Sequence, residues 1–463
     1  MTTQLNRRHF LQASSLAATG LFADPRFSIA QTKSPNEKLN IACIGVGNRG
    51  AANIRAVSGE NIIALCDVDE RQARRMWETF PRAKRYADFR KMLEAMDREI
   101  DAVVVSTPDH THASAALLAL QLGKHVYCEK PLAHNVRECR LVTELARKKK
   151  VATQLGNQLH ASFQVHRAAE LIQAGLIGKV SEVHCASERL TPSEFVFPKP
   201  WASPVTQESG RPKETPPVPP GLDWDLWLGP ARERPYHPAY CPAAWRMWRD
   251  FGTGGLGDMG CHIMDPAFLA LGLKYPISVE AAGPPVPYEK VPMRSGVSVR
   301  YIFPARGEQP PVTLYWHGAG SGPSAELLEG KTGTCLFVGE KGQLLCQHHP
   351  PRRNDEPQLL PIAKFKDVEL PPSRFANLRA SGLSPADIER PHHENWLIGC
   401  KTGVSPACHF PTFGGPLAET ALLGHVAFWA GQKIAWDGEK MRITNCPEAE
   451  KSLRREYRKG WEL

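Results

Sequence analysis

The chain has 463 residues, of which 42% are hydrophobic and 23% are charged, with a formal net charge of +9 at neutral pH. This length exceeds what a single hydrophobic core usually organises, so we expect a globular protein of two domains. Basic residues are scattered among acidic ones, which argues against nucleic-acid binding, and beyond the N-terminus no apolar run approaches the ~18 residues of a membrane span.

Residues 1–30 have the pattern of a removable export signal. Arg7 and Arg8 precede Phe10 and Leu11, a mildly apolar run follows, and small residues end the segment. This order is typical of signal peptides, and the arginine pair favours the twin-arginine route, which exports folded proteins. We therefore expect a periplasmic or extracytoplasmic protein without stable membrane insertion. A frayed basic terminus is the alternative.

After the leader, short apolar runs alternate with segments of helical periodicity. Such alternation predicts parallel strands covered by helices on both faces, hence a doubly wound Rossmann domain over residues 38–157. The expected strands are 39–46, 61–68, 100–107, 124–128 and 151–155, and the expected helices are 49–58, 70–80, 112–122 and 136–149.

Residues 158–450 have a different pattern, with strand-like runs at hairpin spacing that predict an antiparallel sheet. Proline-rich stretches at 190–250 and 350–390 are expected to form long loops that shape the pocket and subunit contacts, and residues 451–463 form a tail. The expected helices are 163–174, 261–271 and 417–431, and the expected strands are 179–187, 278–282, 297–303, 312–316, 335–338 and 343–346.

The chain contains 12 cysteines, and several stand inside apolar strand-like runs, among them Cys43, Cys66 and Cys128. Because no CxxC pair occurs, we expect no structural metal site and interpret most of the cysteines as buried, reduced side chains. A protein that folds in the cytoplasm before export keeps such thiols reduced.

A glycine-rich turn follows the first expected strand directly and opens the first expected helix. Gly45, Gly47 and Gly50 form G-x-G-x-x-G around Asn48 and Arg49. Glycines there allow a tight turn and the close approach of a pyrophosphate, which the helix N-terminus attracts. The alternative is a glycine turn that binds no nucleotide.

Asp67 ends the second expected strand. A carboxylate at this position accepts hydrogen bonds from the adenosine ribose and repels a 2′-phosphate, so we expect NAD and regard NADP as less favoured.

Two more strands end in polar motifs at the same expected sheet edge. The sequence Ser-Thr-Pro-Asp-His-Thr-His, from Ser106 to His112, follows the apolar strand at 100–107. Val-Tyr-Cys-Glu-Lys-Pro-Leu, which contains Lys130, ends the next strand. Ligands bind at this edge of open α/β sheets, which favours a functional role for both motifs.

Together these motifs resemble the Gfo/Idh/MocA family of oxidoreductases. The resemblance implies a Rossmann domain followed by an α/β domain with a large, mostly antiparallel sheet. It places Lys130 beside the nicotinamide and the substrate hydroxyl. It also implies that the cofactor is contacted by Thr107, Pro108, His112 and Glu129.

A second part of the predicted site comes from the Gly-rich segment 254–262. Asp258 and His262 are four residues apart, so on a helix they lie on one face and can point into one cleft opposite Lys130. The alternative is a capping Asp and a packed His; the Asp-x-x-x-His match to the family favours the site.

The resemblance extends to Asp223–Pro230, Trp245–Gly257 and Tyr457–Trp461, which are similar to a signal-bearing branch of the family abundant in planctomycetes and related bacteria. Tryptophans 201, 245 and 248 are candidates to stack on sugar rings, although buried tryptophans are the commoner case. His392 and His393 are interpreted as a helix start and a poor metal-ligand pair.

We therefore expect an NAD-dependent oxidoreductase that acts on a sugar, polyol or glycoside hydroxyl, in which Lys130, His262 and Asp258 are catalytic. NAD is not expected to be freely available after export, so the cofactor should be tightly bound and recycled in the site. The alternatives are a glycoside hydrolase that works by transient oxidation and elimination, and a non-catalytic sugar-binding protein that retains NAD. The expected partners are a small carbohydrate and further copies of the chain in a dimer or tetramer.

Overall fold

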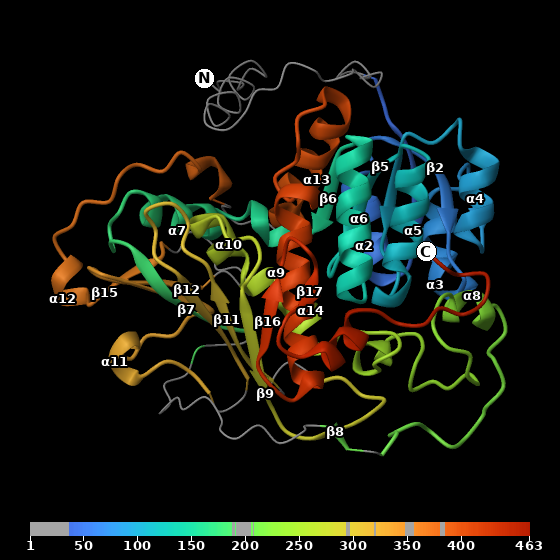
Figure 1. Cartoon of the computed structure of the whole chain (residues 1–463). Helices are drawn as coiled ribbons and strands as arrows, with labels where there is room; N and C mark the ends of the chain where they lie inside the picture. Colours follow the sequence, from blue (N-terminus) through green and yellow to red (C-terminus); the bar gives the residue numbers. More distant parts are fainter. Residues whose placement is uncertain are drawn as a thin grey trace, which may run out of the picture. The chain divides into compact units, whose positions relative to one another are not determined.

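The computed structural model describes residues 37–187, 190, 205–206, 208–292, 297–318, 321–347, 356–379 and 385–463 (Figure 1). The predicted export signal at 1–30 and Trp201 lie outside the described residues. Within the described ranges, no helix is both long and apolar enough to span a bilayer.

The N-terminal part of the described chain forms a six-stranded, wholly parallel sheet in the order β3-β2-β1-β4-β5-β6. This is the doubly wound Rossmann arrangement that the sequence predicts. Its strands are β1 (Asn40–Ile44), β2 (Asn61–Cys66), β3 (Lys84–Tyr86), β4 (Ala102–Val105), β5 (His125–Glu129) and β6 (Thr153–Gly156).

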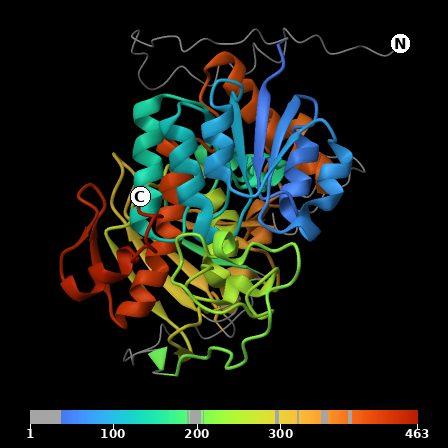
Figure 2. The ribbon, with the colours of Figure 1, turned by 90° about the vertical axis from the view of Figure 1, so that its right-hand side faces the viewer.

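Helices cover both faces of this sheet, as Figure 2 shows from its edge. Successive strand residues point to opposite faces. In β4, Val103 and Val105 pack with one helix layer, whereas Ala102 and Val104 pack with the other. The helices are α2 (Asn48–Ala56), α3 (Glu70–Thr79), α4 (Phe89–Met96), α5 (Asp109–Gln121) and α6 (Val136–Lys149).

The sequence analysis misplaced the start of α5 and left out β3 and α4. The helix begins at Asp109 rather than at residue 112, because Pro108 at its N-cap is extended and Asp109 supplies the acidic first turn. β3 has three residues and no buried one, so it carries no apolar pattern.

The C-terminal part is built on a nine-stranded sheet in the order β15-β14-β13-β7-β12-β11-β9-β16-β17. Only β7 and β12 pair in parallel, so the sheet is mostly antiparallel, as predicted. The strands are β7 (Val180–Ala186), β9 (Ser278–Ala282), β11 (Ser298–Phe303), β12 (Val312–His317), β13 (Cys335–Gly339), β14 (Gly342–Cys346), β15 (Gln358–Leu360), β16 (Ile434–Asp437) and β17 (Arg442–Ile443).

The α-helices of this part were predicted less well than its strands. They are α7 (Phe163–Gln173), α8 (Trp224–Leu228), α9 (Gly254–Ile263), α10 (Asp265–Leu271), α11 (Ala325–Leu328), α12 (Ile362–Phe365), α13 (Pro385–Thr402) and α14 (Gly415–Ala430). Shorter elements are η2 (Gln158–Ala161), η3 (Ala244–Met247), η4 (Ala376–Leu378), η5 (Phe410–Gly414) and η6 (Pro447–Leu453), with β8 (Val205–Thr206) paired to β10 (Val286–Pro287).

Two helix boundaries differ from the expectation for a physical reason. The Gly-rich segment is itself helical, as α9, because its glycines permit close packing: a Cβ on Gly260 would lie 3.3 Å from the Cβ of Ala421 in α14. His392 does not start a helix but lies in the middle of α13, which contains Pro391.

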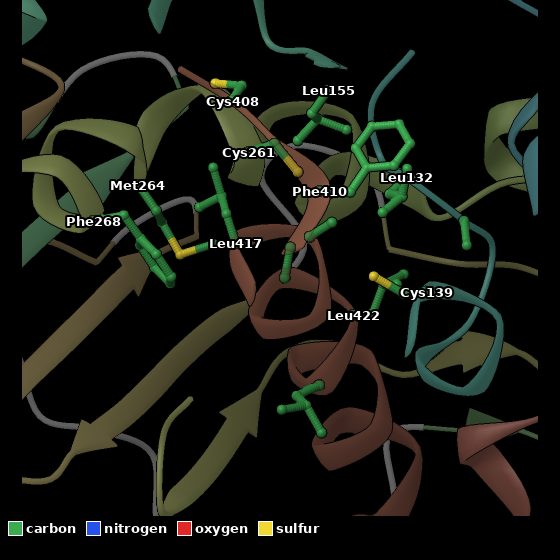
Figure 3. Packing of buried hydrophobic residues seen from close by; sticks show 14 of the residues in the cluster. Leu132, Cys139, Leu155, Cys261, Met264, Phe268, Cys408, Phe410, Leu417 and Leu422 are labelled. Atoms are coloured by element: carbon green, nitrogen blue, oxygen red, sulfur yellow. The ribbon is translucent and has the colours of Figure 1, made fainter. Parts of the chain in front are cut away.

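α14 is buried from Gly415 to Phe428 and packs against α6, α9 and β9. Figure 3 shows Leu417 and Leu422 of this helix among Cys139 of α6 and Met264 and Phe268 of the C-terminal part. Its one buried acid, Glu419, accepts from both Arg140 Nε (2.9 Å) and Arg140 Nη2 (2.6 Å). Apolar packing and a bidentate ion pair therefore join α14 to the Rossmann part.

The 12 cysteines are all free and buried, as predicted. Burial raises the pKa of most of these thiols, Cys261 to about 12 among them. They act as small apolar side chains rather than as nucleophiles.

Candidate active site

A cavity of about 850 Å³ lies at the carboxyl ends of the parallel strands. Ligands bind at this edge of open α/β sheets. α9 and the segment that precedes it form another part of its wall. Of the predicted site residues, those that line the cavity are Gly45, Gly47, Asn48, Arg49, Asp67, Thr107, Pro108, His112, Glu129, Lys130, Asp258 and His262.

The glycine turn is as tight as the motif requires. Gly45 has a φ of +77°, and a Cβ there would lie 2.7 Å from the backbone of Ser106. Gly50 does not line the cavity; a Cβ on it would lie 1.9 Å from the Gly45 carbonyl oxygen. The turn therefore needs glycine at both positions.

α2 begins at Asn48 in this turn and points its N-terminus at the cavity. Gly47 is the N-cap, and the first turn contains no acidic residue. The backbone N–H groups of such an end attract an anion, so this helix start fits a pyrophosphate.

Asp67 stands at the end of β2 with its carboxylate at the cavity wall. Its two oxygens accept from Val46 N (2.8 Å) and Asp69 N (3.0 Å). Burial raises the pKa of Asp67, and these two backbone N–H groups oppose that effect. Further lone pairs can accept from ribose hydroxyls, and the negative charge disfavours a 2′-phosphate.

Thr107, Pro108 and His112 form the loop beyond β4. His112 bridges two strand ends, since its ring nitrogens lie 2.8 Å from the Thr107 carbonyl oxygen and 2.7 Å from that of Pro131. The hydroxyl of Thr107 is buried and has no hydrogen-bond partner among the described residues. It is thus a polar atom at the cavity that a bound ligand can satisfy.

Glu129 lies deep in the same wall and is bound to several donors. Its Oε1 accepts from Arg49 Nε (3.1 Å), Asn53 Nδ2 (2.9 Å) and Gln158 Nε2 (2.7 Å). Burial raises the pKa of Glu129, but the charges of Arg49 and Lys130 outweigh this effect and hold that pKa below its usual range. Glu129 therefore fixes the glycine turn to the end of β5.

α13 lies against this network from the C-terminal part. Glu389 accepts from Arg49 Nη2 (2.8 Å), and His393 Nε2 lies 3.1 Å from Asn53 Oδ1. His392 Nε2 instead donates to the Leu155 carbonyl (2.8 Å), and the two histidine rings are perpendicular. Both histidines thus join α13 to the Rossmann part, and the hypothesis of a poor ligand pair agrees with this geometry.

Lys130 is the first residue after β5 and has a side chain that is 13% exposed. Its Nζ donates to Asp258 Oδ1 (2.6 Å) and to the Asp258 carbonyl oxygen (2.8 Å). The sequence analysis placed Asp258 across the cleft from Lys130, whereas the structure places the two in direct contact. An ion pair therefore closes the inner end of the cavity.

Burial raises the pKa of Asp258, but the Lys130 ammonium opposes this and, with Arg246, holds it well below its usual range. Arg246 Nε lies 3.5 Å from Asp258 Oδ1, and its guanidinium lies 4.2 Å from the centroid of the Trp245 ring. Asp258 is therefore a permanent carboxylate between two cations.

His262 lies one turn beyond Asp258 on α9, is 8% exposed, and lines the same cavity. The four-residue spacing thus has the effect that the sequence analysis expected, because both side chains reach one cleft. An imidazole near the Lys130 ammonium is a second candidate for proton transfer.

Asp109 was present in the quoted motif but received no role. Its Oδ2 accepts from Thr253 N (3.1 Å) and Thr253 Oγ1 (2.5 Å). Thr253 is the N-cap of α9, and burial raises the pKa of Asp109. This clamp fixes the helix that carries Asp258 and His262 to the start of α5. Its pairing joins residues 144 positions apart, so no local pattern reveals it.

Aromatic residues of 222–251 form a cluster beside the cavity. Trp245 and Trp227 line the cavity, at 6% exposure each. Trp248 does not line it; its Nε1 donates to the Ala239 carbonyl (2.7 Å), and Lys290 covers its ring. Of the described tryptophans proposed to contact sugar, Trp245 is therefore placed to do so, and Trp248 is a core residue.

One buried group in the described part of the chain has the spacing of metal ligands: His160, Asp265 and Cys408. Both Asp265 oxygens lie 3.0 Å from His160 Nδ1, and Asn157 Nδ2 donates to the same carboxylate. Internal hydrogen bonds thus occupy the ligand atoms of His160 and Asp265, so we assign these two side chains a structural role.

The cavity fits a nicotinamide dinucleotide. The glycine turn and the α2 N-terminus can bind the pyrophosphate, and the Asp67 carboxylate can accept hydrogen bonds from the adenosine ribose. The buried Thr107 hydroxyl can form a hydrogen bond with the bound ligand. Lys130 then stands where the cavity leaves the strand edge and meets α9.

Comparison with known proteins supports this interpretation. The family model described as the oxidoreductase family, NAD-binding Rossmann fold, matches residues 39–157. The model for the C-terminal alpha/beta domain of the same family matches residues 161–337. The two matches follow one another along the chain and include all the cavity's predicted site residues.

Curated relatives align over only part of this chain. Inositol 2-dehydrogenase of Salmonella paratyphi B is 29% identical over 152 residues, which are 32% of this chain and 45% of that protein. A glycosyl hydrolase family 109 protein of Shewanella pealeana is 26% identical over 205 residues, 38% of this chain and 44% of that protein. The chain thus spans about half the length of the curated relatives it matches.

A solved structure shows the same fold over most of the chain. Levoglucosan dehydrogenase in complex with NADH and levoglucosan superposes with a TM-score of 0.55 and 17% identity, covering 86% of this chain and 99% of that one. Both family models, the sheet order and the motif residues agree. The chain belongs to the Gfo/Idh/MocA oxidoreductase family, with an NAD-binding Rossmann domain and the family's C-terminal alpha/beta domain.

Proposed function

We propose that this protein is an NAD-dependent oxidoreductase that acts on a carbinol of a sugar, polyol or glycoside. The observation that carries the proposal is the contact of Lys130 Nζ with Asp258 at 2.6 Å, inside the cavity that the glycine turn and Asp67 also line. This contact supports a role for Lys130 at the substrate hydroxyl, beside the proposed cofactor site. The inositol and levoglucosan dehydrogenases support a polyhydroxylated substrate.

The side chains divide the proton chemistry between them. An ammonium has three N–H donors, and Lys130 gives two of them to Asp258, so the third can donate to the substrate oxygen. That donor stabilises negative charge on the oxygen while His262 accepts the hydroxyl proton. Bound NAD supplies the hydride acceptor. In the reverse direction the same two groups return the proton to the oxygen.

We further propose that the cofactor stays bound and is recycled in place. The segment 219–230 is held over the end of β2 by backbone hydrogen bonds from Glu70 N to Gly221 O (2.8 Å) and from Asp223 N to Val68 O (2.9 Å). Arg458 of the tail donates to the Gly229 carbonyl (3.0 Å). A strap fixed at both ends supports slow release of a nucleotide beneath it.

Retention also suits the export that residues 1–30 predict. Folded export through the twin-arginine route would carry a bound cofactor to a compartment where free NAD is not expected. Oxidation of one sugar must then be coupled to reduction of a second.

A second candidate is an NAD-dependent glycoside hydrolase, which the Shewanella pealeana relative favours. Transient oxidation makes the proton beside the new ketone acidic; its removal expels the aglycone, water adds, and re-reduction restores the hydroxyl. This route needs two bases, which Lys130 and His262 can supply. A non-catalytic protein that retains NAD needs neither of them.

The test starts from purified protein without added cofactor. Acid denaturation should release about one nicotinamide dinucleotide per chain, identified by absorbance and enzymatic cycling; protein free of nucleotide would contradict retention. The holo-protein is then incubated with free sugar pairs and with aryl glycosides. Paired oxidation and reduction supports the oxidoreductase, release of the aryl group supports the hydrolase, and inertness towards both overturns the catalytic proposal.

A further inference from the structure

A second cavity, of about 960 Å³, lies away from the strand edge and is lined by α6, α14, the 249–253 segment and the C-terminal tail. Its wall is strongly cationic. It contains four acidic residues, Glu144, Asp250, Glu289 and Glu456, against eight basic ones, Arg137, Lys148, Arg211, Arg232, Arg249, Lys451, Arg454 and Arg455.

Three of the four acids in this wall already accept from arginines, two of which, Arg211 and Arg232, belong to the wall itself. Glu289 accepts from Arg211 Nη2 (2.7 Å), and Glu456 from Arg232 Nη2 (3.0 Å). Asp250 accepts from Arg234. These carboxylates are therefore not available to neutralise the remaining cations, and the cavity keeps a positive potential.

Arg249 is the central cation. Its guanidinium contacts two rings, 4.6 Å from the centroid of Tyr288 and 4.2 Å from that of Trp429. Within the described ranges it meets no carboxylate or other acceptor. Burial lowers the pKa of Arg249, although Tyr288 and Glu289 oppose this effect.

Hydrogen bonds fix the backbone of Arg249, which restricts where its side chain can lie. His134 Nε2 donates to its carbonyl oxygen (2.8 Å), and its N–H donates to the Glu289 carbonyl (2.9 Å). The two aromatic contacts use no N–H donor of the guanidinium, so its N–H groups remain available to a ligand. This geometry suits bidentate recognition of a carboxylate or phosphate.

Two further donors face the same cavity. Arg455 donates from Nε to the buried Glu138 carboxylate (2.8 Å) and from Nη2 to the His110 carbonyl oxygen. Its Nη1 is buried and has no hydrogen-bond partner in the described part of the chain. His425 is 8% exposed, and although the Thr253 carbonyl is near, neither ring nitrogen makes a well-formed hydrogen bond to a described residue. Unsatisfied buried donors of this kind call for a ligand.

We propose that this second cavity binds a small organic anion, with its phosphate or carboxylate group at Arg249 and Arg455. The volume is too large for an inorganic ion alone, and the wall also offers Leu422, Val426 and the Trp429 ring to an uncharged body. The ligand class is therefore a phosphorylated or carboxylated small molecule of about the size of a monosaccharide.

The experiment uses the NAD-loaded protein, in which the cofactor cradle is occupied. Thermal unfolding and titration calorimetry are recorded with glucose 6-phosphate, glucuronate, inorganic phosphate and glucose. Binding to the native state raises the unfolding temperature. We expect the first two to raise it at millimolar concentration, inorganic phosphate to act more weakly, and glucose to act only through the active site.

Arg249→Gln separates the two cavities. It should weaken binding of the effective anion by roughly 10-fold or more, since hydrogen bonds between charged groups are worth about 1.5–3 kcal/mol. The response to glucose should stay unchanged. Arg137→Gln, an exposed position in the same wall, is the matched control and should change the affinity less than threefold.

Three results would overturn the proposal. The first is that no anion shifts the unfolding temperature of the wild-type protein. The second is that Arg249→Gln and Arg137→Gln weaken binding equally, which would indicate a diffuse charge effect. The third is a change of molar mass in Arg249→Gln by light scattering without any change in anion binding, which would indicate that another copy of the chain covers the cavity.

Discussion

The two cavities of this molecule are similar in volume and opposite in charge. The active-site cavity has three basic residues, Arg49, Lys130 and Arg246, against six acidic ones, Asp67, Asp69, Asp109, Glu129, Asp258 and Glu389. In the second cavity the basic residues outnumber the acidic ones two to one. Yet it is the acidic cavity that is expected to hold a dinucleotide with two phosphates.

The difference shows that an anion can be bound in two ways. In the first cavity backbone N–H groups at the α2 N-terminus replace side-chain cations, and the cations present are paired with carboxylates, as in Lys130–Asp258. In the second cavity the proposed attraction comes from side-chain guanidinium groups, chiefly that of Arg249 and the unused Nη1 of Arg455. Binding by backbone N–H groups requires a glycine motif that can be recognised in the sequence, whereas binding by guanidinium groups requires no such motif.

The largest effect that tests this contrast is expected for Lys130→Ala. Loss of the ammonium that stabilises negative charge on the substrate oxygen should lower kcat by about 10³-fold, within the range for loss of one such donor, while bound NAD per chain stays unchanged. Lys148→Ala, in the wall of the second cavity, is the matched control and should keep its activity. Full turnover by Lys130→Ala would contradict a catalytic role for Lys130.

The clamp between Asp109 and Thr253 should have the next largest effect. Thr253→Val removes one hydrogen bond to Asp109 and loosens the start of α9, so kcat should fall by about 10²-fold with a small change in KM. Thr253→Ser keeps the hydroxyl and should restore most of the activity. An unchanged kcat in Thr253→Val would show that α9 does not depend on the clamp.

Asp67→Ser tests how the acidic cavity selects its nucleotide. Removing the carboxylate beside the ribose should lower the affinity for NAD by about 10-fold. It should also reduce discrimination against NADP, because the charge that repels the 2′-phosphate is lost. Fluorescence titration of apo-protein with both nucleotides measures the ratio. A ratio equal to that of the wild type would place the adenosine ribose elsewhere.

The smallest predicted effect is the pH dependence of the Lys130–Asp258 pair. The pKa of Asp258 is depressed in the folded state, so its contribution to stability is present above the unfolded pKa of about 3.9 and is lost as pH falls below that value. Asp258→Asn should therefore be less stable than wild type by about 1–3 kcal/mol from pH 8 to 5.

Below pH 4 the stability difference should shrink, as urea unfolding curves at several pH values would show. Glu99→Gln, which removes the exposed partner of Lys84, is the control and should differ from wild type by less than about 1 kcal/mol. A stability difference between wild type and Asp258→Asn that grows as the pH falls would contradict a depressed pKa of Asp258.

Much of this could be predicted from the sequence because local patterns carry it. The strand at 278–282 was placed to the residue, since alternating apolar residues define it. The cavity residues from Gly45 to Lys130 follow strand ends of a parallel sheet, and that topology alone brings them together.

What the sequence could not show depends on pairings across long separations. The contact of Asp109 with Thr253, the bond from Arg49 to Glu389 and the direct pairing of Lys130 with Asp258 each join distant segments. The helix expected from residue 261 in fact begins at Gly254, because Gly-rich α9 is stabilised by packing on α14 rather than by propensity.

The burial of every thiol gives the molecule an internal reporter. All 12 cysteines are shielded, yet Cys66 and Cys241 line the cofactor cavity. When the nucleotide departs, an alkylating reagent used at alkaline pH, because burial raises the pKa of both thiols, should reach Cys66 and Cys241 before the other ten, each adding a fixed mass. Intact-protein mass spectrometry can therefore count emptied molecules in a mixed population, without a substrate and without knowing which sugar the protein acts on.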